Sequence, residues 1–476
     1  MNAIGSTSEL ALDTIHYQPM TVIGPAIQSG ALTSAELTET MLARIEALDG
    51  GLKSYTTVTA DLAREQAARA DAELKQGKYR SPMHGIPIAV KDLCFTKGIK
   101  TTGGMTIYGD FKPDYDATVV TRLEQAGAVL LGKLHMTEGA VLEHHPELPE
   151  PVNPWMHDLW TGVSSSGSGI APAAGLAFGS IGSDTGGSIR WPSACNGLTG
   201  VKPTWGRVSR YGIFDLCATF DHLGPMTRSA ADSAIMLKVL AGYDPKDTTS
   251  LPTPVPDYFG ELDGPDGARG VIIGVDWDFV SEDADPVTLA LLKEAVVVLS
   301  DLGALARPAK FPDPTALFAT TMHLMMAECA AAHADTYPSQ ASKYGPSLAG
   351  MIEMGRSATP VEIGKANIVR QQFRGGVMSL FDEIDVLVVP AFKKMTPTWG
   401  EARSAAASDM TGFMRFTVPF DASGSPTVSL PCGYSDDGRP VGIQLVGAHG
   451  SEALLLKVAH AYQQVTDFHL RRPPNF

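Results

Sequence analysis

The stretch TGVSSSGSGIAPAAGLAFGSIGSDTGGSIR, residues 161–190, decides how the rest of the chain is interpreted. Residues 161–188 hold eight glycines and seven serines, with one Asp and no Lys or Glu, a composition typical of flexible linkers. An apolar run at residues 170–181 interrupts them, and such a run is stable only when it is buried. The serines and glycines therefore flank a buried element at two points 24 residues apart, which is the arrangement of a functional site.

The second of these points, DTGGS at residues 184–188, favours acyl-transfer chemistry. Glycine lets consecutive backbone N–H groups face one position, and two glycines precede Ser188. Acyl transfer needs a nucleophile together with N–H donors for the tetrahedral oxyanion. The first point, residues 162–167, adds a second set of hydroxyl groups.

The base that would activate this nucleophile lies outside the stretch, which contains no histidine. Upstream, the apolar segment GIPIAVKD at residues 85–92 predicts a strand that ends in Lys91. A lysine held in an apolar site has a lowered pKa and can act as a neutral base. Asp92 should point to the opposite side of the strand, so its carboxylate need not keep Lys91 charged.

These segments resemble the amidase signature family, whose pattern joins a lysine after a GIP strand, a serine loop and a DTGGSIR loop. The resemblance continues through residues 192–204, 224–228, 423–431 and 440–447, and so covers nearly the whole chain. It is weakest over residues 250–380. Val163 and Ser166 stand where the family commonly has glycine, and the resemblance implies a cis peptide bond just before Ser164.

The resemblance also implies the roles of individual residues. Ser188 would be the nucleophile, neutral Lys91 the general base, and Ser164 the group that passes the proton between them. The oxyanion would be bound by backbone N–H groups, those of Thr185, Gly186 and Gly187, with Ser188 as a further candidate. No metal and no organic cofactor are implied.

The fold that the resemblance implies is a single-domain α/β/α sandwich around a large, mixed, mostly parallel, twisted β-sheet. We expect one catalytic domain over residues 1–476. Its signature core would span about 83–230, a variable, pocket-lining helical region about 250–380, and the C-terminal part of the sheet about 381–476.

Composition limits the possible partners. The 476 residues are 44% hydrophobic and 19% charged, enough apolar material for a large core. A net charge of −15 argues against a nucleic-acid partner. No apolar run approaches a membrane span, and the first 14 residues lack the features of a signal peptide. We expect a cytoplasmic monomer or homodimer that acts on a small molecule.

Cysteine and histidine spacing indicates no metal site. The five cysteines are scattered, and we interpret them as small buried thiols. His144 and His145 are adjacent, and neighbours on an extended chain point apart. The proline-rich segment at residues 143–151 is therefore expected to be an exposed acidic loop.

Local patterns predict further elements. A cap at Thr33 starts a helix over residues 34–48, another helix covers 61–75, and a β-α-β unit ends in a helix at 117–127 and a strand at 128–132. Helices are also expected at 230–240, 286–302 and within the methionine-rich segment 315–354, and strands at 270–275, 385–390, 427–430 and 443–446. Pro172 requires the helix after the serine loop to start near Ser168. Lys133 follows a near match to a phosphate-binding loop that lacks the required Ser or Thr, and is expected to be structural.

Alternatives remain open at this point. The chain has no GxSxG motif, which disfavours an α/β-hydrolase. Within the resemblance, the chain could be the A-type subunit of a tRNA-dependent amidotransferase, or an inactive scaffold. His135 and the loop after it disfavour the first, and the presence of all three expected catalytic residues disfavours the second. Family members also hydrolyse anilides, carbamates and esters. With the methionine-rich segment as a pocket wall, the expected substrate is a hydrophobic or aryl amide or urethane, as in aryl acylamidases.

Overall fold

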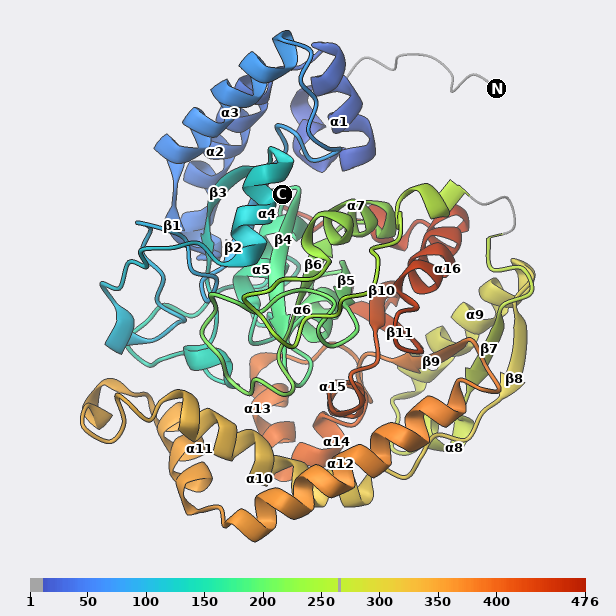
Figure 1. The fold of residues 1–476 in the computed structure, drawn as a ribbon. Coiled ribbons are helices and arrows are strands. Elements are labelled where there is room, and N and C mark those ends of the chain that lie inside the picture. Colours follow the sequence, from blue (N-terminus) through green and yellow to red (C-terminus); the bar gives the residue numbers. More distant parts are fainter. Residues whose placement is uncertain (1–11, 264–266) are drawn as a thin grey trace.

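The computed structural model describes residues 12–263 and 267–476, so most of the segment in which a signal peptide was sought lies outside the described residues. Its centre is one sheet, whose described strands are β1 (Tyr55–Val58), β2 (Pro87–Lys91), β3 (Val129–Leu134), β4 (Gly179–Asp184), β5 (Thr199–Lys202), β6 (His222–Thr227), β7 (Ile272–Val275), β8 (Leu305–Pro308), β9 (Val386–Pro390), β10 (Thr427–Tyr434) and β11 (Pro440–Gly447). They lie in the order β1-β3-β2-β4-β6-β5-β10-β11-β9-β7-β8 (Figure 1).

The sheet is parallel near its two ends and antiparallel in its middle. Strand β2 is parallel to β3 and β4, and β7 is parallel to β8 and β9. The other six of the ten pairings between described strands are antiparallel. The expected mixed α/β sheet is confirmed, but the expectation of a mostly parallel one is wrong. One reason is the connection at residues 435–439, which is too short for the crossover that parallel neighbours need.

Helices cover the sheet and extend beyond it. They are α1 (Met20–Ser29), α2 (Ser34–Leu52), α3 (Ala60–Lys75), α4 (Thr118–Ala126), α5 (Ser166–Ala173), α6 (Arg190–Cys195), α7 (Ala230–Leu240), α8 (Trp277–Ser281), α9 (Pro286–Asp301), α10 (Thr315–Ala332), α11 (Pro346–Ser357), α12 (Pro360–Leu380), α13 (Trp399–Ser408), α14 (Met410–Phe413), α15 (Val418–Ser423) and α16 (Glu452–Val465). Figure 1 shows α10, α11 and α12 together at the bottom of the molecule, away from α1 to α3.

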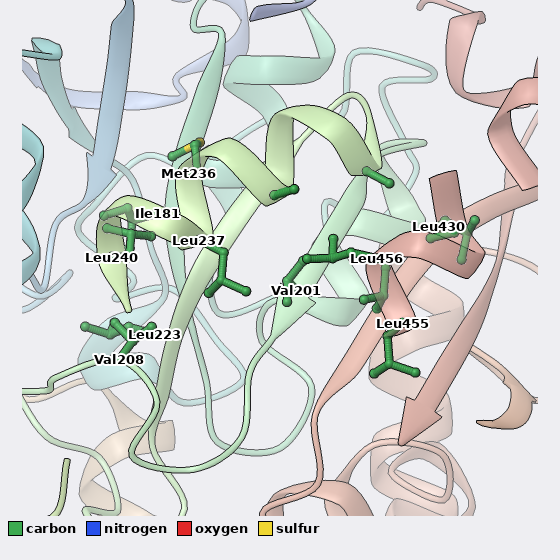
Figure 2. Close-up of a cluster of buried hydrophobic side chains, with 14 of the residues drawn as sticks. Ile181, Val201, Val208, Leu223, Met236, Leu237, Leu240, Leu430, Leu455 and Leu456 are labelled. Carbon is green, nitrogen blue, oxygen red and sulfur yellow. The ribbon is translucent and has the colours of Figure 1, made fainter. Parts of the chain in front are cut away.

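Two pairs of helices enclose the middle of the sheet. Helices α5 and α6 pack against each other and against β5, β6 and β10, while α7 and α16 form a second such pair on these strands. In Figure 2, apolar side chains of α7 and α16 lie over those of the strands: Met236, Leu237, Leu240, Leu455 and Leu456 above Ile181, Val201, Leu223 and Leu430. All nine are buried, so the signature segment lies within the core.

Most of the predicted elements are confirmed. Thr33 and Glu36 form the capping box that begins α2, and α3, α4, β3, α7, β7, α9 and β9 to β11 lie where the sequence predicts them. In the methionine-rich segment, Met325 is buried in the core, and Met322 and Met351 pack against it. These methionines therefore fill the core. The local patterns do not specifically predict helices α12 to α16.

The prediction that Pro172 lies in the first turn of its helix is wrong. Helix α5 begins at Ser166, which places Pro172 near its C-terminal end. Proline has no N–H to donate to the carbonyl four residues earlier. Here that carbonyl, of Ser168, accepts the Ser180 hydroxyl of β4 at 2.6 Å instead. A strand side chain thus replaces the missing helical hydrogen bond.

Ser180→Ala should therefore lower the free energy of unfolding by about 1–3 kcal/mol, because it leaves a buried carbonyl without a partner. The double variant Pro172→Ala/Ser180→Ala should recover part of this loss, since the alanine that replaces the proline supplies an N–H. Urea unfolding of the two single variants and the double variant measures the coupling. Additive effects would contradict this explanation of Pro172.

Candidate active site

Lys91, the last residue of β2, is fully buried and surrounded by hydroxyl groups. Its Nζ lies 2.7 Å from Ser164 Oγ, 2.8 Å from Ser165 Oγ and 2.8 Å from Ser183 Oγ. Within the described residues no carboxylate makes an ion pair with it. Burial lowers its pKa to about 7, although Cys94 and the carboxylates of Asp184 and Asp221 act in the opposite direction.

The hydroxyl network sets the direction in which a proton can move. A neutral amine donates two hydrogen bonds and accepts one, so one of the three serines must donate to Nζ. The Ser165 hydroxyl donates to the Ser183 carbonyl at 3.1 Å, so it is engaged as a donor. Ser164 has no other acceptor among the described residues and is free to donate to Lys91.

The loop that carries Ser164 has the backbone that the resemblance implies. The peptide bond between Val163 and Ser164 is cis, as expected. The Ser164 carbonyl accepts the Thr137 N–H at 3.1 Å. Gly162 has a φ of +72°, and a Cβ there would lie 2.3 Å from Pro192 Cα, so only glycine fits. Close contact with the start of α6 thus fixes the position of the serine loop.

The second loop, residues 185–189, is fixed at its base by Asp184, the last residue of β4. One carboxylate oxygen accepts the Gly187 N–H at 2.6 Å, and the other accepts the Ile189 N–H at 3.0 Å. The Arg190 guanidinium binds both oxygens at 2.9 Å. Burial opposes the charge on Asp184, but Arg190 outweighs it and holds the pKa of this carboxyl well below its usual range.

Arg190 also joins this loop to the C-terminal part of the chain. Its guanidinium lies 2.6 Å from the Asp421 carboxylate of α15 and donates to the Thr417 carbonyl at 2.9 Å. All of these groups are fully buried. Asp184, Arg190 and Asp421 are called the loop clamp below.

The backbone donors near Ser188 differ in part from the predicted set. Because the Gly187 N–H already donates to Asp184, the inclusion of Gly187 in the oxyanion-binding group is wrong. The N–H groups of Thr185, Gly186 and Ser188 have no acceptor within the described residues. Gly187 is needed for another reason: its φ is +134°, and a Cβ there would lie 2.7 Å from Trp191.

Ser188 lies close to the serine loop but is not bonded to it. Its side chain is buried except for 8% of its surface, and its hydroxyl has no hydrogen-bond partner in the described part of the chain, Ser164 included. The two loops nevertheless meet at Gly182, where a Cβ would lie 3.1 Å from both Ser165 Oγ and Ile189 Cγ1. The structure thus joins Lys91 to Ser164 directly, and leaves Ser188 accessible.

A buried carboxyl group lies behind the second loop. The Thr185 hydroxyl donates to Asp221 at 2.5 Å, and the N–H groups of Leu216 and Cys217 donate to its other oxygen at 3.0 Å. Burial raises the pKa of Asp221 to about 7. This carboxyl and Lys91 therefore titrate in the same pH range.

An apolar wall borders both loops. We call it the aromatic cluster, and its rings contact one another with centroids 5.0–6.4 Å apart: Trp160, Trp191, Phe392, Trp399 and Phe413. Val163, Met414 and Val418 pack in the same cluster. A Cβ at Gly186 would lie 3.5 Å from Val418 and 3.8 Å from Met414, so this wall touches the loop of Ser188.

The loop at residues 143–151 is not the exposed segment that we expected. His145 is only 5% exposed, and His144 packs against Trp399 and lies 3.2 Å from the Ser166 hydroxyl. Burial lowers the pKa of His144 to about 3. No group of three or more His, Cys, Asp or Glu side chains in residues 12–263 and 267–476 is placed to bind a metal ion.

Two further predictions are confirmed. Lys133 is buried and structural: it donates to the Cys94 carbonyl and to the hydroxyls of Thr96 and Thr101. Asp92 points away from Lys91 and accepts the Thr102 N–H at 3.0 Å. The cysteines are all free and buried. Every described helix is too short or too polar to span a lipid bilayer.

Sequence reasoning missed three parts of this site. Ser183 directly precedes the DTGGS motif and could have been found there, as could Ser165 beside Ser164. Arg190 lies within the motif, but its partner Asp421 is 231 residues away and no local signal points to it. The aromatic cluster likewise combines distant segments.

Comparisons with known proteins agree with this geometry. The amidase family model matches residues 36–456. The putative amidase AmiD of Mycobacterium tuberculosis is 46% identical over 464 residues, 97% of each chain. The A-type subunit of the glutamyl-tRNA(Gln) amidotransferase of Chloroflexus aggregans is 36% identical over 485 residues, 96% of this chain and 98% of the relative.

A solved structure of the peptide amidase PAM with the competitive inhibitor chymostatin superimposes with a TM-score of 0.84 at 30% identity. The match covers 96% of this chain and 99% of that one. The chain therefore belongs to the amidase family, whose enzymes hydrolyse C–N amide bonds.

Proposed function

We propose that this chain hydrolyses amide bonds through an acyl-enzyme on Ser188, with Ser164 and Lys91 transferring the proton. The observation that carries the proposal is the buried Lys91 amine, which has three hydroxyl partners and no carboxylate partner within the described residues. An amine in that position is a base at neutral pH.

In the first half-reaction, Ser188 Oγ attacks the amide carbon and its proton passes to Ser164 Oγ, while the Ser164 proton moves to Lys91 Nζ. The oxyanion is bound by the free N–H groups of Thr185, Gly186 and Ser188. The C–N bond then breaks, and the Lys91 proton returns through Ser164 to the leaving amine. Water hydrolyses the ester to release the carboxylic acid and restore Ser188.

The substrate we propose is a hydrophobic or aryl amide, with an aryl carbamate (urethane) as the related alternative. Support comes from the aromatic cluster beside the loop of Ser188, because such a wall binds an apolar group and leaves the carbonyl to the N–H donors. This cluster replaces the methionine-rich segment as the proposed pocket wall. We further propose that residues 1–476 act as one catalytic domain in the cytoplasm.

The second candidate is the A-type component of a tRNA-dependent amidotransferase, and the match to such a protein over 96% of the chain supports it. The higher identity to an amidase, 46% against 36%, favours a hydrolase that acts alone. Turnover of simple amides by the purified chain would support the hydrolase, whereas activity that requires further protein components would support the amidotransferase. An inactive scaffold would show neither.

Ser188→Ala should abolish turnover and covalent labelling by a fluorophosphonate, because it removes the proposed nucleophile. Ser193→Ala is the matched control, since Ser193 is a buried serine five residues along whose hydroxyl has no partner among the described residues. The control should retain both activities. Labelling that survives in Ser188→Ala would move the nucleophile to another residue, with Ser164 and Ser165 as the next candidates.

The acylation rate should rise with pH through a single ionisation near pH 7 and reach a plateau on the alkaline side. The pKa of Lys91 is lowered to about 7, and only the neutral amine above that pH is a base. Lys91→Ala should remove this ionisation, and should slow amides more than activated esters, whose leaving groups need no proton.

Asp221 provides the control for this pH profile, because its pKa is raised to about 7. The ionisation should persist in Asp221→Asn. If it is lost there and remains in Lys91→Ala, then the carboxyl group behind Thr185 controls the rate, and Lys91 is not the base.

Met414→Ala should raise KM for aryl amides about tenfold and should change KM for small aliphatic amides much less, because it removes apolar contact beside Gly186. Met325→Ala is the matched control, since it removes a core methionine of α10. Steady-state kinetics on paired aryl and aliphatic amides measures the difference. Equal changes for both substrates would place the aryl group elsewhere.

A further inference from the structure

A cluster of arginines gathers at a second place in this acidic chain. The guanidinium carbons of Arg44, Arg228 and Arg472 lie 5.6, 5.7 and 4.1 Å from the ring centre of Tyr17, just before α1. Arg471 precedes Arg472 and lies over a different ring, that of Tyr434, at 4.7 Å. Three separate segments of the chain therefore bring positive charge together.

These arginines differ in their partners. Arg44 and Arg228 donate to main-chain carbonyls around the end of α5, at Ala174, Gly175, Pro172 and Ala177. Arg471 and Arg472 are exposed, and their side chains have no ion pair or hydrogen bond with any described residue. Their guanidinium N–H donors are thus left to solvent or to a ligand.

Between these groups lies a cavity of about 190 Å³. Its polar lining includes Arg228, Arg471, Arg472, Thr21, Ser229 and Gln464. Asp232 is the only carboxylate among the described residues that line it, and one of its oxygens accepts the Met20 N–H at 2.9 Å. Cations and neutral donors therefore outnumber the negative groups around an open volume.

The position of the cavity separates it from the proposed catalytic site. None of Lys91, Ser164 and Ser188 is among its lining residues. It is formed by segments before α1 and α7 and after α16, and Figure 1 shows the C-terminus beside α7, far from α10 to α12.

We propose that this cavity binds a phosphate-type oxyanion, inorganic phosphate or the head of a small phosphate ester, held by Arg471 and Arg472 with Arg228 behind them. Guanidinium groups bind such oxyanions through paired N–H donors. The volume suits one such group and excludes an acyl chain. This site is independent of the amide-hydrolysing function.

Calorimetric titration of the full chain with inorganic phosphate, at constant ionic strength, tests the proposal. Wild type should show saturable one-site binding, and Arg471→Ala/Arg472→Ala should bind at least tenfold more weakly. Lys97→Ala/Lys365→Ala is the matched control, because it removes two exposed positive charges elsewhere and should bind like wild type. Unchanged amide turnover in both double variants verifies that they fold.

Arg471→Lys/Arg472→Lys separates charge from geometry, and it should show intermediate affinity because lysine retains the charge without the paired donors. A sedimentation assay with vesicles of phosphatidylcholine and phosphatidylglycerol distinguishes the source of the oxyanion. The proposal is overturned if wild type shows no saturable phosphate binding, if both alanine double variants lose it equally, or if only the vesicles bind.

Discussion

The ion pairs of the loop clamp are the interaction on which the rest of this site depends. Asp184 ends β4 and Arg190 begins α6, so the loop that carries Ser188 is held at both of its ends by one buried salt bridge. Asp421 adds a second bridge from a segment more than 200 residues away. Removing one partner of such a group typically costs about 3–5 kcal/mol, since it leaves an unpaired charge in the interior. The reactive loop is therefore as rigid as the core beneath it.

Two buried lysines on neighbouring strands show how the surroundings separate structure from chemistry. Lys133 on β3 has a carboxylate 3.8 Å away, that of Asp92, which favours the charged ammonium. Lys91 on β2 has only hydroxyl groups within hydrogen-bonding distance. Hydroxyl groups can donate as well as accept, so they accommodate both the neutral and the charged amine. That makes Lys91 suited to gaining and losing a proton, and Lys133 suited to holding one.

Much of the fold and of the site can be predicted from the sequence, where the signal is local. The strand ending in Lys91, the capping box at Thr33 and the two serine loops all follow from short patterns whose physical causes lie within a few residues. The local pattern misplaces Pro172 because the hydroxyl that compensates for it belongs to another element. The burial of His144 and the proximity of the aromatic cluster to Gly186 depend on packing between distant segments. The motif alone suggests an oxyanion role for Gly187 because composition does not show that a side chain already uses its N–H.

The order of the strands has a consequence for how the protein is made. Strands β1 to β6 form one half of the sheet and β7 to β9 the other, and only the β10–β11 hairpin joins them. That hairpin is synthesised after both halves, so the growing chain carries two unpaired edges, at β5 and at β9. Exposed edges of this kind invite pairing with other chains. The ribosome thus releases a protein whose halves are complete before they are connected, and a newly made chain depends on protection from aggregation until the hairpin closes the gap.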